Sequence, residues 1–457
     1  MKNNFFCPLP FEQVSASTDG HYNVCCESFH NFDKITNKTP LEWFNSDPMI
    51  EIRDAFLSSN PLGNPLVNKT CAPCIRRSNL SLHNKRMREI TEFKTRTKYE
   101  IDPNNIDPLA LKNNLRNKKV MRTNIEKHLS GEELTQLASM HFSGFGNHCN
   151  LHCIMCSPTA SSKWASSNTY KSHKGKDKKY WKDVEFIMKD EKDRKGFFDS
   201  VYSFLDKDEP LHITLTGGES LINPSDSAFI EHLSKNPFAK KNLSLFINTN
   251  GTVPAKIVKK LGIGNFKNVT LSISFDGMDR VYDYIRWGKP WETYNKNMKD
   301  LHKLADEIET LYLHTFTTVS ALNVHLIPDM IKYSMDNNYF RWHKNWVTDE
   351  GDVKSKAGKN SYSKFKYHFL YNSFIHNRPE NEGKADINLS NLPNHLKEEY
   401  LKKLQKVDVE GVNLERISEI LENPEQTEDT TYKIRNYLDY FSKICKIDWK
   451  EIWPEFQ

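Results

Sequence analysis

Short runs rich in β-branched and aromatic residues alternate with helical stretches from about residue 138 onward. Six runs are expected to be strands: Met140–Phe145, His212–Thr216, Ser244–Asn248, Val269–Phe275, Tyr312–Thr318 and Phe340–Val347. The helices expected between them are Ser225–Leu233, Val253–Leu261, Trp291–Glu307 and Ile327–Met335. Such β/α units in series predict a parallel sheet with right-handed crossovers. An open sheet and a partial barrel both fit, and both place a site at the carboxyl ends of the strands.

The segments that flank this series have a different sequence pattern. Thr39-Pro40-Leu41-Glu42 has the form of a capping box with proline at the first helical position, and Asp47-Pro48 marks a second helix start. Residues 76–135 are basic and polar and are expected to be helical in pieces, whereas residues 352–395 look loop-like. The rest of the C-terminal stretch favours helix, so we expect a helical extension after the series.

Eight of the nine cysteines lie in the first 156 residues of the chain. The nine cysteines are Cys7, Cys25, Cys26, Cys71, Cys74, Cys149, Cys153, Cys156 and Cys445. The sequence begins without the apolar stretch of a signal peptide, and no run reaches the roughly 18 apolar residues that cross a membrane. We therefore expect a cytoplasmic protein without membrane contact, whose clustered cysteines bind metal or take part in catalysis and form no disulfides.

Positive charge is also unevenly distributed. The chain has a net charge of +5, but residues 76–127 alone hold 14 Lys or Arg against 6 Asp or Glu. A solvated helical surface is the simplest interpretation of this excess. A groove for an acidic peptide or for a nucleic acid backbone is the functional alternative.

Cys149, Cys153 and Cys156 form a C-x3-C-x2-C pattern directly after the first expected strand. Three thiolates on one tight loop can hold three irons of a 4Fe–4S cluster, for which cysteine is the usual ligand. The fourth iron then stays open to the amine and carboxylate of a small ligand such as S-adenosylmethionine (SAM), whose sulfonium accepts an electron. Zinc with a further ligand such as His152 is the alternative.

With this loop the sequence resembles the radical SAM superfamily, over about residues 138–350. Thr216-Gly217-Gly218-Glu219 ends the second expected strand and resembles the GGE motif of that family. The resemblance implies that Gly218 and Glu219 meet the methionine amine of SAM, with Gly217 in the same cofactor-binding turn. Glycine lets a backbone approach a ligand closely, and a carboxylate suits an ammonium group. A simple turn at a strand end is the alternative.

The resemblance also implies contacts for the rest of SAM. Ser274 and Asp276 end the fourth expected strand, where relatives contact the ribose and methionine parts. Arg286 corresponds to an arginine that faces the methionine carboxylate, and a surface ion pair is the alternative. Met155 precedes the last cysteine of the loop, where the backbone of relatives meets adenine; its side chain could also belong to the core. Asn248-Thr249-Asn250-Gly251 resembles the family's third-strand turn only weakly, because Asn-Gly turns are common.

A second set of cysteines precedes the series. Cys7 and Cys25 belong to a C-x12-G-x4-C pattern, and Cys71 and Cys74 form a C-x2-C. Four thiolates suit a fully ligated 4Fe–4S cluster or a structural zinc. Beside a radical SAM core they resemble the shorter, twitch form of the SPASM/twitch auxiliary-cluster modules, although relatives usually carry that module after the core. Cys26 could replace Cys25 as the ligand.

These patterns together predict an α/β fold in four parts. We expect a twitch-like auxiliary-cluster domain at residues 1–80, a basic helical linker at 81–137, a radical SAM core built as a partial (β/α)6 barrel at 138–350, and a helical C-terminal extension at 351–457.

The resemblance implies an enzyme that cleaves SAM reductively to a 5′-deoxyadenosyl radical and removes a hydrogen atom from a substrate. A peptide or protein, modified or matured by the reaction, is the expected substrate; a nucleotide, an RNA or a sugar is the alternative. The electron would come from a reducing partner such as flavodoxin or ferredoxin. A non-catalytic iron–sulfur or zinc protein that binds nucleic acid is the alternative from another class.

Overall fold

The structure is a computed structural model that describes residues 5–28, 30–79, 119–167, 191–205, 210–337, 339, 365–371, 384–407, 414–422 and 430–457. Its strands are β1 (Gln13–Ala16), β2 (Tyr22–Asn23), β3 (Ser139–Phe142), β4 (His152–Cys153), β5 (Leu211–Leu215), β6 (Leu243–Thr249), β7 (Asn268–Ser274), β8 (Arg286–Trp287), β9 (Leu311–Val319) and β10 (Phe365–Tyr371).

The α-helices of the described residues fall into three groups along the chain. The first group is α1 (Pro40–Phe44), α2 (Asp47–Leu57), α3 (Pro65–Thr70), α4 (Ala72–Asn79) and α7 (Lys119–Leu129). The second is α8 (Ser162–Ser166), α10 (Glu191–Tyr202), α11 (Pro224–Ser234), α12 (Ala239–Asn242), α13 (Ala255–Lys260), α14 (Asp279–Ile285), α15 (Trp291–Glu307) and α16 (Ile327–Asp336). The third is α17 (Asn394–Leu404), α18 (Glu415–Glu422) and α19 (Thr431–Cys445). A search of the described residues finds no helix with the length and apolar character needed to cross a bilayer.

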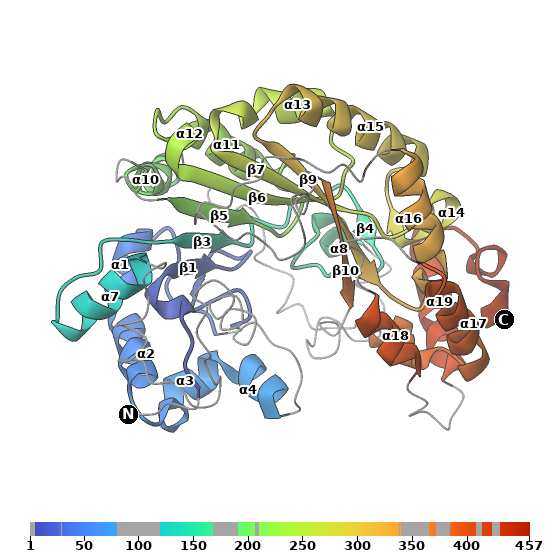
Figure 1. Ribbon diagram of the computed structural model, residues 1–457, viewed down its shortest axis with the longest axis horizontal. Coiled ribbons are helices and arrows are strands. Elements are labelled where there is room, and N and C mark those ends of the chain that lie inside the picture. Colours follow the sequence, from blue (N-terminus) through green and yellow to red (C-terminus); the bar gives the residue numbers. More distant parts are fainter. Residues whose placement is uncertain are drawn as a thin grey trace.

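A mostly parallel sheet of eight strands forms the centre of the molecule (Figure 1). Its order is β10-β9-β7-β6-β5-β3-β1-β2, and every neighbouring pair is parallel except β1 with β2. Helices α11, α12, α13 and α15 lie along the outer side of the sheet in Figure 1, with the N-terminal helices at one end and α17–α19 at the other. The α/β fold class with a helical C-terminal extension, predicted from the sequence, is confirmed.

The expected elements of the central series agree closely with the observed ones. The first five predicted strands correspond to β3, β5, β6, β7 and β9, and α15 begins and ends at the predicted residues. Trp291, Tyr294, Met298 and Leu301 are buried along one face of α15, which is the spacing of a helix that packs against a sheet. Apolar periodicity was therefore sufficient to locate these elements.

The sheet extends beyond the predicted series at both edges. At one edge β1 pairs in parallel with β3, so residues 13–16 of the N-terminal segment join the central sheet. At the other edge β10 pairs in parallel with β9. The expectation that residues 352–395 are loop-like is wrong at β10, whose sequence Phe-Lys-Tyr-His-Phe-Leu-Tyr alternates aromatic residues as strands do. The strand predicted at Phe340–Val347 lies outside the described residues.

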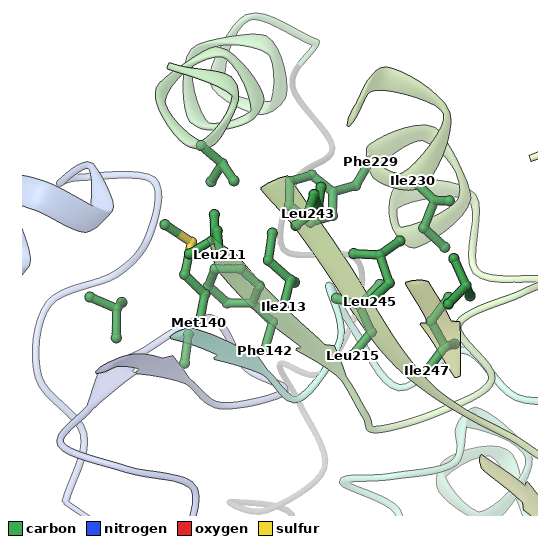
Figure 2. Packing of buried hydrophobic residues seen from close by; sticks show 14 of the residues in the cluster. Met140, Phe142, Leu211, Ile213, Leu215, Phe229, Ile230, Leu243, Leu245 and Ile247 are labelled. Atoms are coloured by element: carbon green, nitrogen blue, oxygen red, sulfur yellow. The ribbon is translucent and has the colours of Figure 1, made fainter. Parts of the chain in front are cut away.

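One face of the sheet packs against the outer helices (Figure 2). On β6 every second residue is buried, and Leu243, Leu245 and Ile247 point toward Phe229 and Ile230 of α11. Burying each of these side chains contributes about 1.5–3 kcal/mol relative to leaving it exposed. The intervening residues of β6 are only partly buried, because they face the inner side of the curved sheet.

The N-terminal helices begin where the sequence predicts. Thr39 and Glu42 form the expected capping box, since the Thr39 hydroxyl accepts from the Glu42 backbone N–H and the Glu42 carboxylate accepts from the Thr39 backbone N–H. On α2, Arg53 is fully buried and donates through Nε to the Pro10 carbonyl at 2.8 Å. Burial lowers the pKa of Arg53 to about 9. This contact ties α2 to the turn that follows Cys7.

The C-terminal helices form a second apolar core beside the Cys149–Cys156 loop. This core contains Phe441 of α19 together with Ile154, Trp164 and Tyr284 of the central series. The Tyr437 hydroxyl donates to the Ile154 carbonyl at 3.0 Å. The extension therefore packs directly on the loop that carries the cysteine triplet.

Candidate active site

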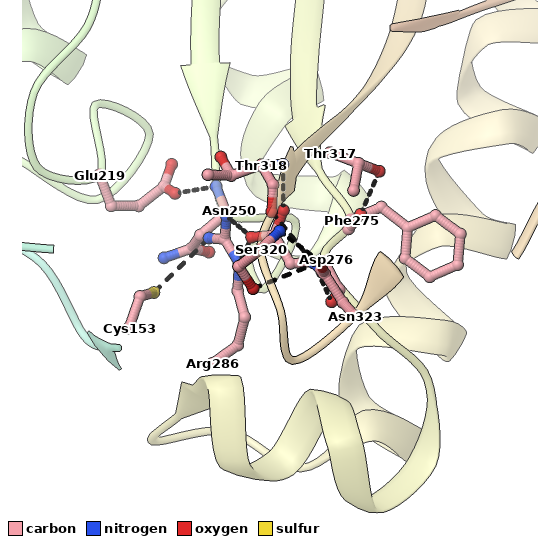
Figure 3. Close-up of polar contacts among 10 residues, drawn as sticks. All are labelled: Cys153, Glu219, Asn250, Phe275, Asp276, Arg286, Thr317, Thr318, Ser320 and Asn323. Atoms are coloured by element: carbon pink, nitrogen blue, oxygen red, sulfur yellow. Dashed lines mark hydrogen bonds and ion pairs between the residues drawn. The ribbon is translucent and has the colours of Figure 1, made fainter. Parts of the chain in front are cut away.

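The residues predicted to bind the cluster at the cysteine triplet and its SAM, together with Asn250, gather at the carboxyl ends of the parallel strands. The cysteine loop follows β3, Glu219 follows β5, Asn250 follows β6 and Asp276 follows β7. Parallel strands present these ends at one edge of a sheet, which is where α/β proteins place their sites. Figure 3 shows Cys153, Glu219, Asn250, Asp276 and Arg286 converging at this edge.

The cysteine loop folds back so that its three thiols lie together. Cys149 and Cys153 are 7% and 4% exposed, and Cys156 packs against them. The Cys156 backbone N–H donates to the Cys153 carbonyl at 2.9 Å, and the indole Nε1 of Trp164 donates to the same carbonyl at 2.9 Å. Cys153 also pairs with Arg286 across β4 and β8. The predicted triplet is thus one compact group of thiols at the edge of the sheet.

Burial favours the protonated form of Cys149, and it contributes to the same effect at Cys153. It raises the pKa of Cys149 to about 12, and a hydrogen bond with Cys156 followed by burial raises the pKa of Cys153. A metal centre that binds here must therefore displace protons from the sulfurs, and its charge would compensate the buried thiolates.

The two glycines before Glu219 are required by packing between loops of the protein. Gly217 has a φ of +103°, and a Cβ there would lie 2.0 Å from the Ser143 carbonyl oxygen. A Cβ at Gly218 would lie 2.3 Å from the His148 carbonyl oxygen. The sequence predicted a close approach to a ligand. The structure adds that both glycines also let the strand end touch the start of the cysteine loop.

Glu219 is a fully buried carboxylate. Its Oε1 accepts from Thr249 Oγ1 at 2.9 Å and from the Leu221 backbone N–H at 3.2 Å, and its Oε2 accepts from the Asn250 backbone N–H at 2.6 Å. Burial raises the pKa of Glu219 to about 7. A carboxylate that is this poorly solvated gains strongly from a cation, so an ammonium group is a fitting ligand.

Asp276 and Arg286 form a buried ion pair. Arg286 Nε donates to Asp276 Oδ2 at 2.6 Å, and Asp276 Oδ1 accepts from the Thr318 backbone N–H at 2.7 Å. Burial alone would lower the pKa of Arg286, but Asp276 and its other anionic neighbours raise it. Arg286 also points Nη1 at Cys153 Sγ, 3.6 Å away. The sequence assigned both residues to SAM, and the structure shows that they first hold each other beside the cysteine loop.

Other predicted positions are less enclosed. Ser274 is half-buried at the last position of β7, and Met155 is half-buried between the cysteine group and the C-terminal core. Asn250 was not among the predicted site residues, yet it is 5% exposed and contacts both Glu219 and the cysteine loop. The sequence signals for it were its place in a turn directly after a predicted strand and the weak resemblance of that turn to the family's third-strand turn.

The four N-terminal cysteines line one cavity. Cys7, Cys25, Cys71 and Cys74 face it together with the apolar side chains of Phe5, Leu9, Val24 and Phe56. With its opening to solvent the cavity measures about 390 Å³, and Cys26 is not among its lining residues. Burial, followed by the neighbouring cysteines, raises the pKa of Cys25. In the described residues no three His, Cys, Asp or Glu side chains stand close enough to ligate a single metal ion.

A third buried carboxylate, Asp226, supports the start of the cysteine loop. It is 1% exposed, its Oδ1 accepts from the Phe145 backbone N–H at 2.7 Å, and burial raises its pKa to about 7. The pKa of Asp226 is higher in the folded protein than in the unfolded chain, so the protonated carboxyl stabilises the fold. This contribution is complete below the unfolded pKa of 3.8 and is lost as the pH rises through about 7.

Asp226→Asn should therefore change how stability depends on pH. Asparagine keeps an acceptor for Phe145 but does not ionise. Relative to wild type, the variant should gain roughly 2–3 kcal/mol between pH 5 and pH 8. Urea unfolding at several pH values measures this difference. Asp336→Asn, at an exposed carboxylate on α16, should show no such trend; a constant offset between Asp226→Asn and wild type would contradict the expectation.

Comparison with known families finds one match. Residues 144–318 match the model of the radical SAM superfamily. This interval contains the cysteine triplet, Glu219, Asp276 and Arg286. It lies inside the region where the sequence resembled that family, so the recognition made from the sequence is confirmed there. No curated protein matches the chain.

The solved structures that match the chain are distant from it. Native anSMEcpe with bound AdoMet is 14% identical, with a TM-score of 0.36, over 58% of this chain and 59% of that one. Streptococcus suis SuiB bound to S-adenosylmethionine is 11% identical, with a TM-score of 0.33, over 62% and 61%. SuiB bound to its precursor peptide SuiA is 12% identical, with a TM-score of 0.32, over 48% and 42%. The match thus spans less than two thirds of each of these solved chains.

Proposed function

We propose a function from the premise that residues 144–318 form a radical SAM domain and that the chain is a radical SAM enzyme. In this proposal Cys149, Cys153 and Cys156 hold a 4Fe–4S cluster, and the open iron binds SAM. The observation that carries the proposal is the compact group of three thiols beside a buried carboxylate at the carboxyl edge of a parallel sheet. The three thiols suit a cluster because cysteine is its usual ligand and one iron stays open.

The surrounding residues would orient SAM. Glu219 would take the methionine ammonium, and Gly217 and Gly218 keep that edge free of side chains. Arg286, held by Asp276, would face the methionine carboxylate, while Ser274 and Asp276 would lie toward the ribose and the backbone of Met155 toward adenine. A reduced cluster held by these cysteines would supply the electron that splits SAM into methionine and a 5′-deoxyadenosyl radical, and that radical would remove a hydrogen atom from the substrate.

Formation of 5′-deoxyadenosine is the direct test. The protein, reconstituted with iron and sulfide without oxygen and reduced with dithionite, should form 5′-deoxyadenosine from SAM. A protein that carries the cluster and binds SAM but forms none under these conditions would contradict the proposal.

The substrate that we propose is a peptide or protein. The support is the likeness of Cys7, Cys25, Cys71 and Cys74 to an auxiliary-cluster module, together with the cavity that these four thiols share. A 4Fe–4S cluster spreads its ligands around several irons, so it accepts thiols set wider apart than a single zinc ion does.

Flavodoxin or ferredoxin is the proposed electron donor. A nucleic acid partner and the cytoplasmic location stay predictions.

Glu219→Gln should weaken SAM binding while the iron content stays unchanged. The substitution keeps the shape of the side chain but removes the negative charge opposite the ammonium. A charge-assisted hydrogen bond contributes about 1.5–3 kcal/mol, so the affinity should fall roughly ten- to a hundredfold. Arg286→Ala should weaken binding by a similar factor through the carboxylate.

Equilibrium binding of SAM to the reconstituted protein measures both effects. Asp226→Asn is the matched control, because Asp226 is buried near Glu219 but is assigned no contact with SAM; its affinity should equal that of wild type. Unchanged affinity in both Glu219→Gln and Arg286→Ala would refute these assignments.

A further inference from the structure

The side-chain amide of Asn250 is held in one orientation. Its Oδ1 accepts from the Thr252 backbone N–H at 2.9 Å and from Thr252 Oγ1 at 2.6 Å. A backbone N–H can only donate, so the amide oxygen must face Thr252 and the NH₂ group must face the other way. That group lies 2.8 Å from Asn150 Oδ1 and 3.8 Å from Cys149 Sγ. The hydrogen-bond network therefore points an N–H donor at a sulfur of the cysteine triplet.

The backbone around this amide is equally constrained. The Asn250 N–H donates to the Glu219 carboxylate at 2.6 Å, and Asn150 Nδ2 donates to Thr252 Oγ1 at 2.8 Å. Gly251 has a φ of +74°, and a Cβ there would lie 2.5 Å from the ring of Tyr294. Because the turn is fixed on all sides and buried, its N–H donor is in place before any cofactor binds.

We propose that Asn250 is a positioning residue that donates an N–H···S hydrogen bond to Cys149 and so raises the reduction potential of the cluster. This inference rests on the proposed function, because it requires the cluster at Cys149. Reduction adds one electron from a low-potential donor, and the added negative charge is shared by the ligand sulfurs. A fixed N–H donor stabilises that charge, since hydrogen bonds to sulfur are among the factors that set cluster potentials.

Asn250 is the donor that can be tested separately. Arg286 also donates to a ligand sulfur, at 3.6 Å from Cys153, but it pairs with Asp276 and is assigned to SAM. A change at Arg286 would therefore alter several properties together. Asn250 contacts Cys149 through one side-chain group, and its other contacts are with Asn150, Thr252 and the backbone link to Glu219.

The test is a redox titration of the reconstituted full-length protein without SAM, followed by electron paramagnetic resonance. The signal of this cluster is identified by its change when SAM is added afterwards. Asn250→Ala should lower the equilibrium constant of cluster reduction about three- to tenfold, which shifts the midpoint potential to a more negative value. A tenfold change corresponds to 59 mV for a one-electron reduction. Asn250→Asp, which keeps the side-chain size and an acceptor for Thr252, should shift it in the same direction.

Thr252→Val is the matched control. It removes one hydroxyl from the same network but leaves the Thr252 backbone N–H that fixes the Asn250 amide, so its potential should equal that of wild type. An unchanged potential in Asn250→Asp, or an equal shift in Thr252→Val, would overturn the role of Asn250. If Asn250→Ala does not retain iron, the midpoint potential of Asn250→Asp is the measurement that decides the role of Asn250. A wild-type protein without a SAM-responsive cluster would overturn the proposed function itself, and the two failures are thereby distinguished.

Discussion

Alanine in place of Cys149, Cys153 or Cys156 should reduce the yield of 5′-deoxyadenosine to the background level. The three thiols form one packed group, and each would hold one iron of the cluster. A cluster with only two protein ligands would lose its iron or the arrangement that leaves one iron open to SAM. The measurement is the amount of 5′-deoxyadenosine formed after dithionite reduction, together with the iron content of each variant.

Cys445→Ala is the control for this experiment. Cys445 is also a buried thiol, 3% exposed, but it lies at the end of α19 in the C-terminal core. Its replacement should leave both iron content and SAM cleavage at the wild-type level. A normal yield from any one of the three loop variants would remove the assignment of the triplet as the site of cleavage.

Replacing Cys71 and Cys74 together should remove a second cluster and leave SAM cleavage largely intact. The reconstituted wild-type protein should contain about eight irons per chain, and this double variant about four. The complementary variant without Cys149, Cys153 and Cys156 should also keep about four irons, in a cluster whose spectrum does not respond to SAM because all its irons are ligated. Turnover of the true substrate should be lost in the double variant.

The topology of the sheet explains why the two groups of cysteines should act independently. Cys25 follows β2, which runs antiparallel to β1, so it lies at the amino end of β1. β1 is parallel to β3, and the cysteine triplet follows the carboxyl end of β3. The two groups therefore follow opposite ends of the neighbouring strands β1 and β3.

Cys26→Ala is the control for the second cluster. Cys26 adjoins Cys25 in sequence but does not line the cavity of the other four thiols, so its loss should not change the iron content. The second cluster is falsified if the variant without the loop cysteines binds zinc and no iron. The N-terminal cysteines would then form a structural zinc site, and their role would be in folding.

The sequence was sufficient wherever function depends on residues that are close along the chain. The spacing of Cys149, Cys153 and Cys156 limits them to one loop, and the motif from Thr216 to Glu219 ends a strand that its own apolar pattern predicts. The limits of α15 follow from its helical periodicity in the same way. Local spacing determines these features, because a helix or strand exposes its side chains at a fixed period.

Only the tertiary structure decided which groups meet across the sheet. The ion pair of Asp276 with Arg286 and the contact of Asn250 with Cys149 are two examples that the spacing of these residues in the sequence did not predict. The same holds for β1 and β10, since strand neighbours are chosen by packing and hydrogen bonding over the whole sheet. The sequence therefore determined which reactive groups are present. The fold determined which neighbouring residues bury them, orient them and set their protonation.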